Sequence, residues 1–204
     1  NTDWGDFGHI NQPVFSVHGI IYGAVCSWGE NVPEYKELNR QISVLEFGDA
    51  SGQFLEVMAK TNSCTVFDWS NVVTIKEWAQ RGMDKDKIRE IFERADMSKV
   101  PECNGRIAEI EVELRKLSRS MDSRSRGIVE CMHMSLEAMR VWNETGLFLS
   151  KRDKGEQPDN GAQVAGDLER CAHYYQQIWR SNSKEGDIMK ITDIFCWYAD
   201  LVRQ

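Results

Sequence analysis

The sequence predicts an α/β fold in which a central, mostly parallel sheet is flanked by helices. From about residue 41 onward, short apolar runs alternate with longer stretches whose apolar residues recur at helical spacing. At 204 residues, with 41% hydrophobic and 28% charged residues, the chain is long enough to enclose one continuous core. We therefore expect a single domain over residues 1–204. Its core spans 41–204, and 1–40 form an N-terminal extension or a cap over the substrate side.

The individual elements follow from the local pattern. Short apolar runs between turn residues are predicted as strands: 42–47, 64–67, 128–132 and 147–151, with one or two more in 188–201. Amphipathic stretches are predicted as helices: 53–60, 71–80, 105–120, 134–142 and 164–180. Residues 87–93 fit either a helix or a strand, and Pro101 is expected to stop regular structure. Within the extension, 14–26 are expected to be extended or to form a short hairpin.

Bulk properties exclude several classes of protein. A net charge of −7 argues against a protein that coats nucleic acid with a positive surface, although an enzyme with a local basic pocket stays open. No apolar stretch approaches the roughly 20 residues that cross a bilayer, and the first residues do not resemble a signal peptide. The six cysteines are scattered without a Cys-x-x-Cys pair, which favours reduced thiols in the cytoplasm and argues against a metal site.

A glycine-containing turn follows the first predicted strand and precedes a predicted helix. It spans residues 46–52 and reads Glu-Phe-Gly-Asp-Ala-Ser-Gly. Glycines let the backbone pass close to a ligand, and the helix N-terminus offers free N–H groups. The turn resembles the first motif of the class I S-adenosylmethionine-dependent methyltransferases, whose fold is Rossmann-like. Ala50 replaces the middle glycine of that motif.

Further segments resemble the same family in the same order, over residues 41–151. Asp68 ends the second predicted strand, where the family has the carboxylate that binds the ribose. Asp96 resembles the acid that contacts adenine, and 128–151 resemble the fourth strand, helix and fifth strand. The resemblance implies S-adenosylmethionine as cofactor, bound by Glu46, Gly48, Asp49, Ala50, Gly52, Asp68, Trp69, Asp96, Met97 and Glu130. Each acid also has a structural interpretation: Glu46 as a helix cap, Asp68 as a turn former, and Asp96 as a helix-end carboxylate.

The methyl acceptor is predicted from what is missing. Ribose 2′-O-methyltransferases of this fold use a Lys-Asp-Lys-Glu set, of which only Lys151 can be placed, as the one candidate catalytic residue. A ring nitrogen such as guanine N7 needs positioning and no general base. We therefore expect methylation of an RNA cap, or a GTP-like substrate, at guanine N7. Stacking and phosphate contacts are expected from Tyr22, Arg124, Arg126, His133, Lys151, Arg152 and Tyr198.

The chain ends suggest a source. Asn1 and Gln204 resemble the ends that a glutamine-specific polyprotein protease leaves in nidoviruses. This favours a viral cap methyltransferase similar to those of toroviruses, acting in the host cytoplasm. Three alternatives remain open: a ribose 2′-O-methyltransferase, a small-molecule methyltransferase, and a catalytically inactive methyltransferase-like binding domain.

Overall fold

The computed structural model of the chain describes residues 12–29, 33–82, 85–181 and 185–204. Throughout these ranges the regular structure is helical, and no strand occurs in them. The extended pairing found there is one isolated antiparallel bridge between Asp49 and Met121. The prediction of an α/β, Rossmann-like fold with a mostly parallel sheet is therefore wrong. No helix within the described ranges is long and apolar enough to cross a membrane.

The α-helices of the described residues differ widely in length, from 6 to 28 residues. Their bounds are α1 Val17–Trp28, α2 Tyr35–Leu45, α3 Phe54–Ala59, α4 Trp69–Gln80, α5 Lys85–Arg94, α6 Val100–Leu117, α7 Arg126–Asp153, α8 Gly161–Trp179 and α9 Glu185–Arg203. Short 3-10 turns join several of them: η1 Pro13–Ser16, η2 Lys60–Ser63, η3 Met97–Lys99 and η4 Ser123–Ser125.

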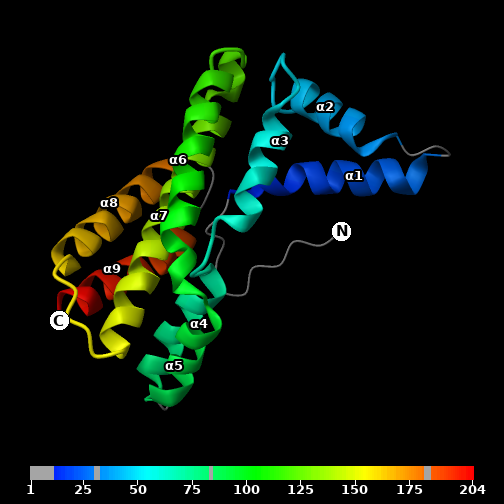
Figure 1. The fold of residues 1–204 in the computed structure, drawn as a ribbon. Coiled ribbons are helices and arrows are strands. Elements are labelled where there is room, and N and C mark those ends of the chain that lie inside the picture. Colours follow the sequence, from blue (N-terminus) through cyan, green and yellow to red (C-terminus); the bar gives the residue numbers. More distant parts are fainter. Residues whose placement is uncertain (1–11, 30–32, 83–84, 182–184) are drawn as a thin grey trace.

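The helices form a bundle with an arm. Helices α6 and α7 run side by side along the long axis of the bundle, α8 and α9 pack on one side of them, and α4 and α5 lie at one end (Figure 1). Helices α1 and α2, here called the arm, extend away from the other side of α6 and α7 (Figure 1). Helix α3 joins the arm to the bundle through contacts with α2 and α6.

Helix α7 explains most of the error in the predicted fold. Two of the predicted strands, 128–132 and 147–151, the predicted helix 134–142 and the turn between them are all parts of this one 28-residue helix. Most positions of α7 are buried, and the more exposed ones include Glu130, His133, Glu137, Arg140 and Glu144, which recur every three or four residues as one polar stripe. The prediction instead followed the short apolar runs at 128–132 and 147–151, which also fit buried strands.

The other predicted strands are also replaced. Residues 42–47 form the end of α2 and the turn after it, 64–67 form an irregular link, and 188–201 lie in α9. Residues 14–26, expected to be extended, lie in η1 and α1. Pro101 lies in the first turn of α6 instead of ending regular structure. A proline is tolerated there because the N–H groups of the first turn have no partner within the helix.

The amphipathic stretches were predicted correctly. The predicted helices 53–60, 71–80, 105–120 and 164–180 correspond to α3, α4, α6 and α8, with small shifts at their ends. The ambiguous stretch 87–93 is the helix α5. A surface helix keeps one polar face, so its periodicity stays visible in the sequence.

Two hydrophobic clusters stabilise the fold, and α7 contributes to both. The larger cluster joins α7 to α4, α5, α8 and α9, and contains the buried rings of Trp142, Phe195 and Tyr198. The smaller cluster joins α7 to α2, α3 and α6, around Leu114 and Leu136. Since α7 is shared, the bundle and the layer formed by the arm and α3 are built on one common helix.

The link between η2 and α4 is held by a side chain of α7. Asn143 is fully buried, and its Oδ1 accepts a hydrogen bond from the Val66 N–H at 2.8 Å. Its Nδ2 donates to the Cys64 carbonyl at 2.8 Å. One helix turn away, Gly146 leaves room for Phe67, since a Cβ there would lie 2.5 Å from the ring. Gly146 is therefore required for close packing inside a helix.

Candidate ligand-binding cavity

The 46–52 turn, predicted to hold a cofactor, connects α2 to α3. Gly48 and Gly52 have positive φ angles of 63° and 73°, conformations that glycine adopts without strain. The buried Asp49 carboxylate accepts hydrogen bonds from the backbone N–H groups of Ser51, Gln53 and Phe54 at 2.9, 2.6 and 2.9 Å. The acid therefore satisfies N–H groups at the start of α3, the groups that the prediction assigned to a ligand.

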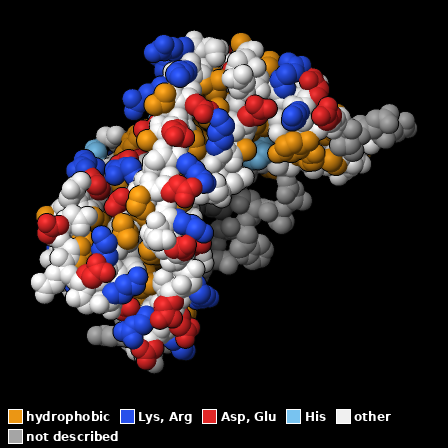
Figure 2. Space-filling model, in the orientation of Figure 1, with side chains coloured by type: hydrophobic (Ala, Val, Ile, Leu, Met, Phe, Trp, Pro, Cys, Tyr) orange, Lys and Arg blue, Asp and Glu red, His pale blue; other side chains and the backbone are white. Residues whose placement is uncertain are grey.

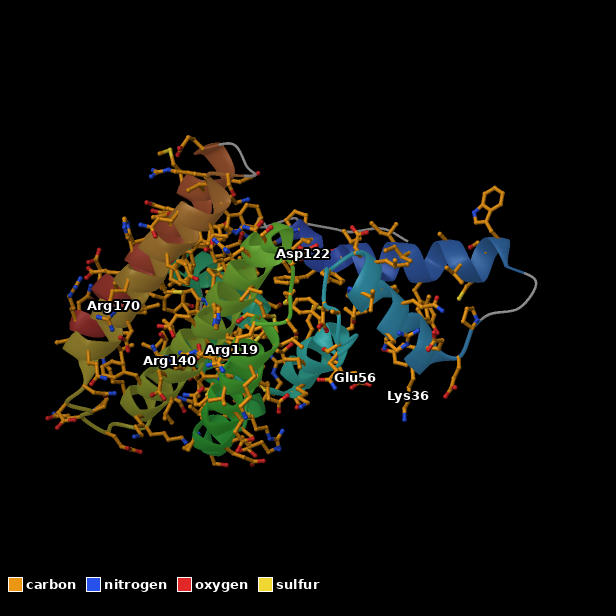
Figure 3. All side chains as sticks on the ribbon, turned by 90° about the horizontal axis from the view of Figure 1, so that it is seen from above. Lys36, Glu56, Arg119, Asp122, Arg140 and Arg170 are labelled. Carbon is orange, nitrogen blue, oxygen red and sulfur yellow. The ribbon has the colours of Figure 1, made fainter. Side chains whose placement is uncertain are left out.

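The same turn packs against the segment between α6 and α7. The Asp122 N–H donates to the Gly48 carbonyl at 3.1 Å, and a Cβ on Gly48 would lie 2.4 Å from Ser125 Oγ. Asp122 lies where the arm side of the molecule meets the start of α7 (Figure 3). Arg126 is exposed at the first position of α7, and the side chain of Arg124 lies outside the described residues. The sequence thus identified two segments that do meet, but their contact is structural.

The remaining predicted cofactor residues lie far apart in the fold. Asp68 is not the turn former of its structural interpretation but the N-cap of α4, where its carboxylate accepts a hydrogen bond from the Asn71 N–H at 2.9 Å. Trp69 packs on Trp142, with ring centroids 5.9 Å apart. Asp96 and Met97 lie together at η3, the first exposed and the second buried. Glu130 is exposed on α7, and Glu46 and Ala50 are exposed on the α2–α3 turn.

Asp96 and Met97 do line a depression, but Asp96 and two other charged side chains of its wall already have partners. Arg89 on its wall contacts Asp153 at 3.1 Å, also on the wall. The Ser98 hydroxyl donates to the Asp96 carboxylate at 2.5 Å and lowers the pKa of that acid. A ligand would have to break these pairs, so the depression is a poor candidate for a binding site.

The predicted substrate residues are not brought together either. Tyr198 is buried in the larger cluster, where its hydroxyl donates to the Val72 carbonyl at 2.7 Å. Lys151 and Arg152 are exposed near the end of α7, and Arg152 donates to the Leu201 carbonyl at 2.9 Å. His133 is half-buried on α7, and burial lowers its pKa. Tyr22, on α1, touches Tyr35 at a centroid distance of 5.7 Å.

The most enclosed cavity of the described residues lies between the arm, α3 and α7, and Tyr35 of that tyrosine pair lines it. Its volume is about 260 Å³, slightly below the ~300 Å³ at which small-molecule sites usually begin. The cavity lies on the α2–α3 side of the molecule, which is marked by Lys36 and Glu56 in Figure 3. Arg140 and Arg170 mark the opposite, α7–α8 side (Figure 3). Its walls come from η1, α1, α2, α3, η2 and α7.

Helical spacing explains why these side chains share one space. On α7, Met132, Ser135 and Met139 follow one another at intervals of three and four residues, so they lie on one face. The opposite walls repeat this spacing and are formed by Phe15 and His18, Tyr35 and Asn39, and Leu55, Met58, Ala59 and Asn62, with Thr61 beside them.

The described part of the lining contains no side chain of the four strongly charged types. None of its twelve described side chains is Asp, Glu, Lys or Arg, although these four types make up 28% of the sequence. The chemical character comes from aromatic rings and methionines on the one hand and from small neutral polar groups on the other. An uncharged wall does not compensate the cost of removing an ion from water, which favours an uncharged ligand.

Several polar groups of the cavity have hydrogen-bonding capacity to spare. His18 Nδ1 is buried without a hydrogen-bond partner. The hydroxyls of Ser135 and Thr61 donate to carbonyls of their own helical turns, Cys131 at 3.1 Å and Met58 at 2.8 Å. Buried polar atoms are normally satisfied, so an unpaired one in a cavity is where a ligand or water is expected.

The arm that forms one wall also exposes large apolar side chains. Figure 2 shows apolar side chains at the surface of this part of the molecule, and the exposed fractions are 90% for Trp28 and 83% for Leu45. Helix α1 contains no charged residue in its 12 positions and buries none of them fully. The arm therefore carries an exposed apolar surface in addition to one wall of the cavity.

Comparison of the chain with models of known protein families, with curated proteins and with solved structures gave no significant match. Any functional assignment therefore rests on the residues of this chain and on their arrangement.

None of the twelve described lining residues was among the predicted site residues. Tyr22, which was predicted, does not line the cavity but contacts Tyr35, which does. His18 and Asn39 are isolated polar residues, and nothing in their local pattern distinguishes them from other surface positions. The strongest available signal was on α7, where Ser135 interrupts an apolar face between Met132 and Met139. That signal requires knowing that 126–153 is a helix.

Proposed function

We propose that this chain is a binding module for a small uncharged organic molecule, held in the cavity between the arm, α3 and α7. The observation that carries the proposal is the lining itself. Its described residues include no Asp, Glu, Lys or Arg, but they include polar atoms without a hydrogen-bond partner among the described residues, such as His18 Nδ1. A ligand with an apolar body and a few neutral polar groups fits both properties.

A purely structural void is the competing explanation. Voids left by imperfect packing are small and apolar, whereas this one, at about 260 Å³, could hold several water molecules at ~30 Å³ each. Three methionines, Met58, Met132 and Met139, line it, and their unbranched side chains adapt to ligands of different shape.

The test uses two probes that differ in charge. Benzamide and benzoate have nearly the same size and shape, and only benzoate is ionised at pH 7. Titrations are followed by the NMR signals of ¹³C-labelled methionine methyl groups. We expect benzamide to shift the signals of Met58, Met132 and Met139 in a saturable way, with about millimolar affinity for so small a ligand, and to leave that of Met189 on α9 unchanged.

A variant with an obstructed cavity provides the control. Ala59→Trp adds a large ring at the cavity wall and is expected to abolish the benzamide shifts. Ala108→Trp, at another exposed alanine in a helix, should preserve them. Equal binding of benzoate, or benzamide binding that survives Ala59→Trp, would contradict the proposal, as would the absence of any saturable shift.

Methyl transfer to an RNA cap stays a prediction. Its support came from a succession of strands and helices that the fold does not contain, and two acids assigned to the cofactor, Asp49 and Asp68, already cap helices. Calorimetric titration with S-adenosylmethionine tests it directly, since no measurable heat of binding would exclude the cofactor and with it the activity.

A further inference from the structure

The hydrogen-bonding state of the cavity hydroxyls restricts the ligand further. Ser135 is 5% exposed, and its hydroxyl donates its only proton to the Cys131 carbonyl, four residues earlier in α7. A hydroxyl oxygen has two lone pairs in addition to that proton. Ser135 lines the cavity, and its hydroxyl offers a ligand acceptor capacity only, because turning its proton toward a ligand would break the bond to Cys131.

Thr61 is in the same situation on the opposite wall. Its hydroxyl donates to the Met58 carbonyl at 2.8 Å, so Oγ1 is also left with acceptor capacity. Among the described residues, no lysine or arginine lines the cavity to donate a proton. The donors are the amide groups of Asn39 and Asn62, for which the described residues supply no side-chain partner.

We propose that the ligand is a hydrogen-bond donor: a neutral molecule whose hydroxyl or amide N–H binds Ser135 Oγ while its apolar body packs against the methionines. This inference rests on the proposed function and specifies the ligand class of the same cavity. It excludes carboxylates and phosphate esters, which are negatively charged at neutral pH, because the described lining offers no lysine or arginine to compensate the cost of removing that charge from water.

Phenol and anisole separate a donor from a non-donor. Both present an oxygen on an aromatic ring, and only phenol has a proton to donate. Their dissociation constants are measured by the methionine methyl shifts in the wild-type chain and in Ser135→Ala. We expect phenol to lose about tenfold in affinity in Ser135→Ala, the magnitude of one ordinary hydrogen bond, and anisole to lose none. Comparing the change for each ligand cancels the difference in their size.

Thr145→Val is the matched control. The Thr145 hydroxyl is also buried on α7 and donates to the carbonyl four residues earlier, Val141, at 2.8 Å, but it does not line the cavity. This variant should bind phenol like the wild type. The helical circular dichroism of both variants verifies that they are folded.

The outcomes are distinguishable. If phenol and anisole bind and respond equally to Ser135→Ala, the donor inference is overturned while the binding function stands. If phenol, anisole and benzamide all fail to shift the methionine signals in the folded wild-type chain, the proposed function fails, and this inference fails with it.

Discussion

Buried polar side chains hold the non-helical segments of this chain in place. Asn143 satisfies three backbone groups of the link between η2 and α4, since its Oδ1 also accepts from the Phe67 N–H at 3.4 Å. Asp49 does the same for the turn before α3. A buried backbone group without a partner costs about 1–3 kcal/mol, so each of these residues replaces several such penalties with hydrogen bonds.

His133 is expected to make the stability of the protein depend on pH. Burial lowers its pKa in the folded state, so the unfolded state binds the proton at a higher pH than the folded state does. The free energy of unfolding should therefore be constant above the ordinary histidine pKa of about 6.5, and should fall as the pH drops below it. Urea unfolding measured between pH 8 and pH 5 tests this, and His133→Gln should show a smaller loss on the acid side.

The control for this measurement is His173→Gln, at an exposed position of α8. If His133→Gln and the wild type lose stability in parallel as the pH falls, burial of His133 is not the cause.

At the scale of elements, α7 organises the molecule because three kinds of contact meet on it. Its two apolar faces belong to the two hydrophobic clusters, its Asn143 holds the link before α4, and its Ser135 lines the cavity. A helix buried on most of its circumference tolerates few changes of side-chain volume. The effect of a substitution in α7 is therefore expected to follow from packing and not from helix propensity.

Two glycine substitutions test this expectation. Helix propensity alone predicts that glycine to alanine stabilises a helix by about 0.5–1 kcal/mol. Gly146→Ala should instead destabilise by about 1–3 kcal/mol, because the added Cβ would lie 2.5 Å from Phe67 Cγ. Gly105→Ala, at an exposed position of α6, should stabilise the protein, since a Cβ there meets nothing within 4 Å. Midpoints of urea unfolding measure both, and a stabilising Gly146→Ala would contradict the close packing.

At the scale of the whole molecule, the shared helix couples the two clusters. The tryptophans that belong to a cluster are all in or against the larger one: Trp69, Trp78, Trp142, Trp179 and Trp197. Tryptophan fluorescence therefore reports on the larger cluster, whereas circular dichroism at 222 nm reports on all helices. If the clusters unfold together, a substitution in the smaller one must shift both signals equally.

Leu114→Ala provides this test. Leu114 is fully buried in the smaller cluster, so its truncation should cost about 2–5 kcal/mol. We expect the fluorescence and circular dichroism midpoints in urea to fall by the same amount. Leu45→Ala, at a leucine that is 83% exposed, should leave both within about 0.5 kcal/mol of the wild type. A shift confined to the dichroism signal would mean that the two clusters unfold separately.

Several helices with a solvent-exposed face could be predicted from the sequence. The patterns of 71–80, 105–120 and 164–180 predicted α4, α6 and α8, because a polar face makes the helical period visible. The sequence also determined that 46–52 is a turn requiring glycine and an acid, since those residue types follow from local backbone conformation. What the acid binds is not local, and the turn was assigned a cofactor when its partners are the N–H groups of α3.

The continuity of 126–153 as one helix was missed, although Glu130, His133 and Glu137 begin a polar stripe at helical spacing, because its short apolar runs also fit buried strands. The location of the cavity, in contrast, depends on how the helices pack. The cavity joins residues that are more than a hundred positions apart, from Phe15 to Met139. Such a site has no signature along the chain, because its chemistry arises when separate helices present single side chains to one shared space.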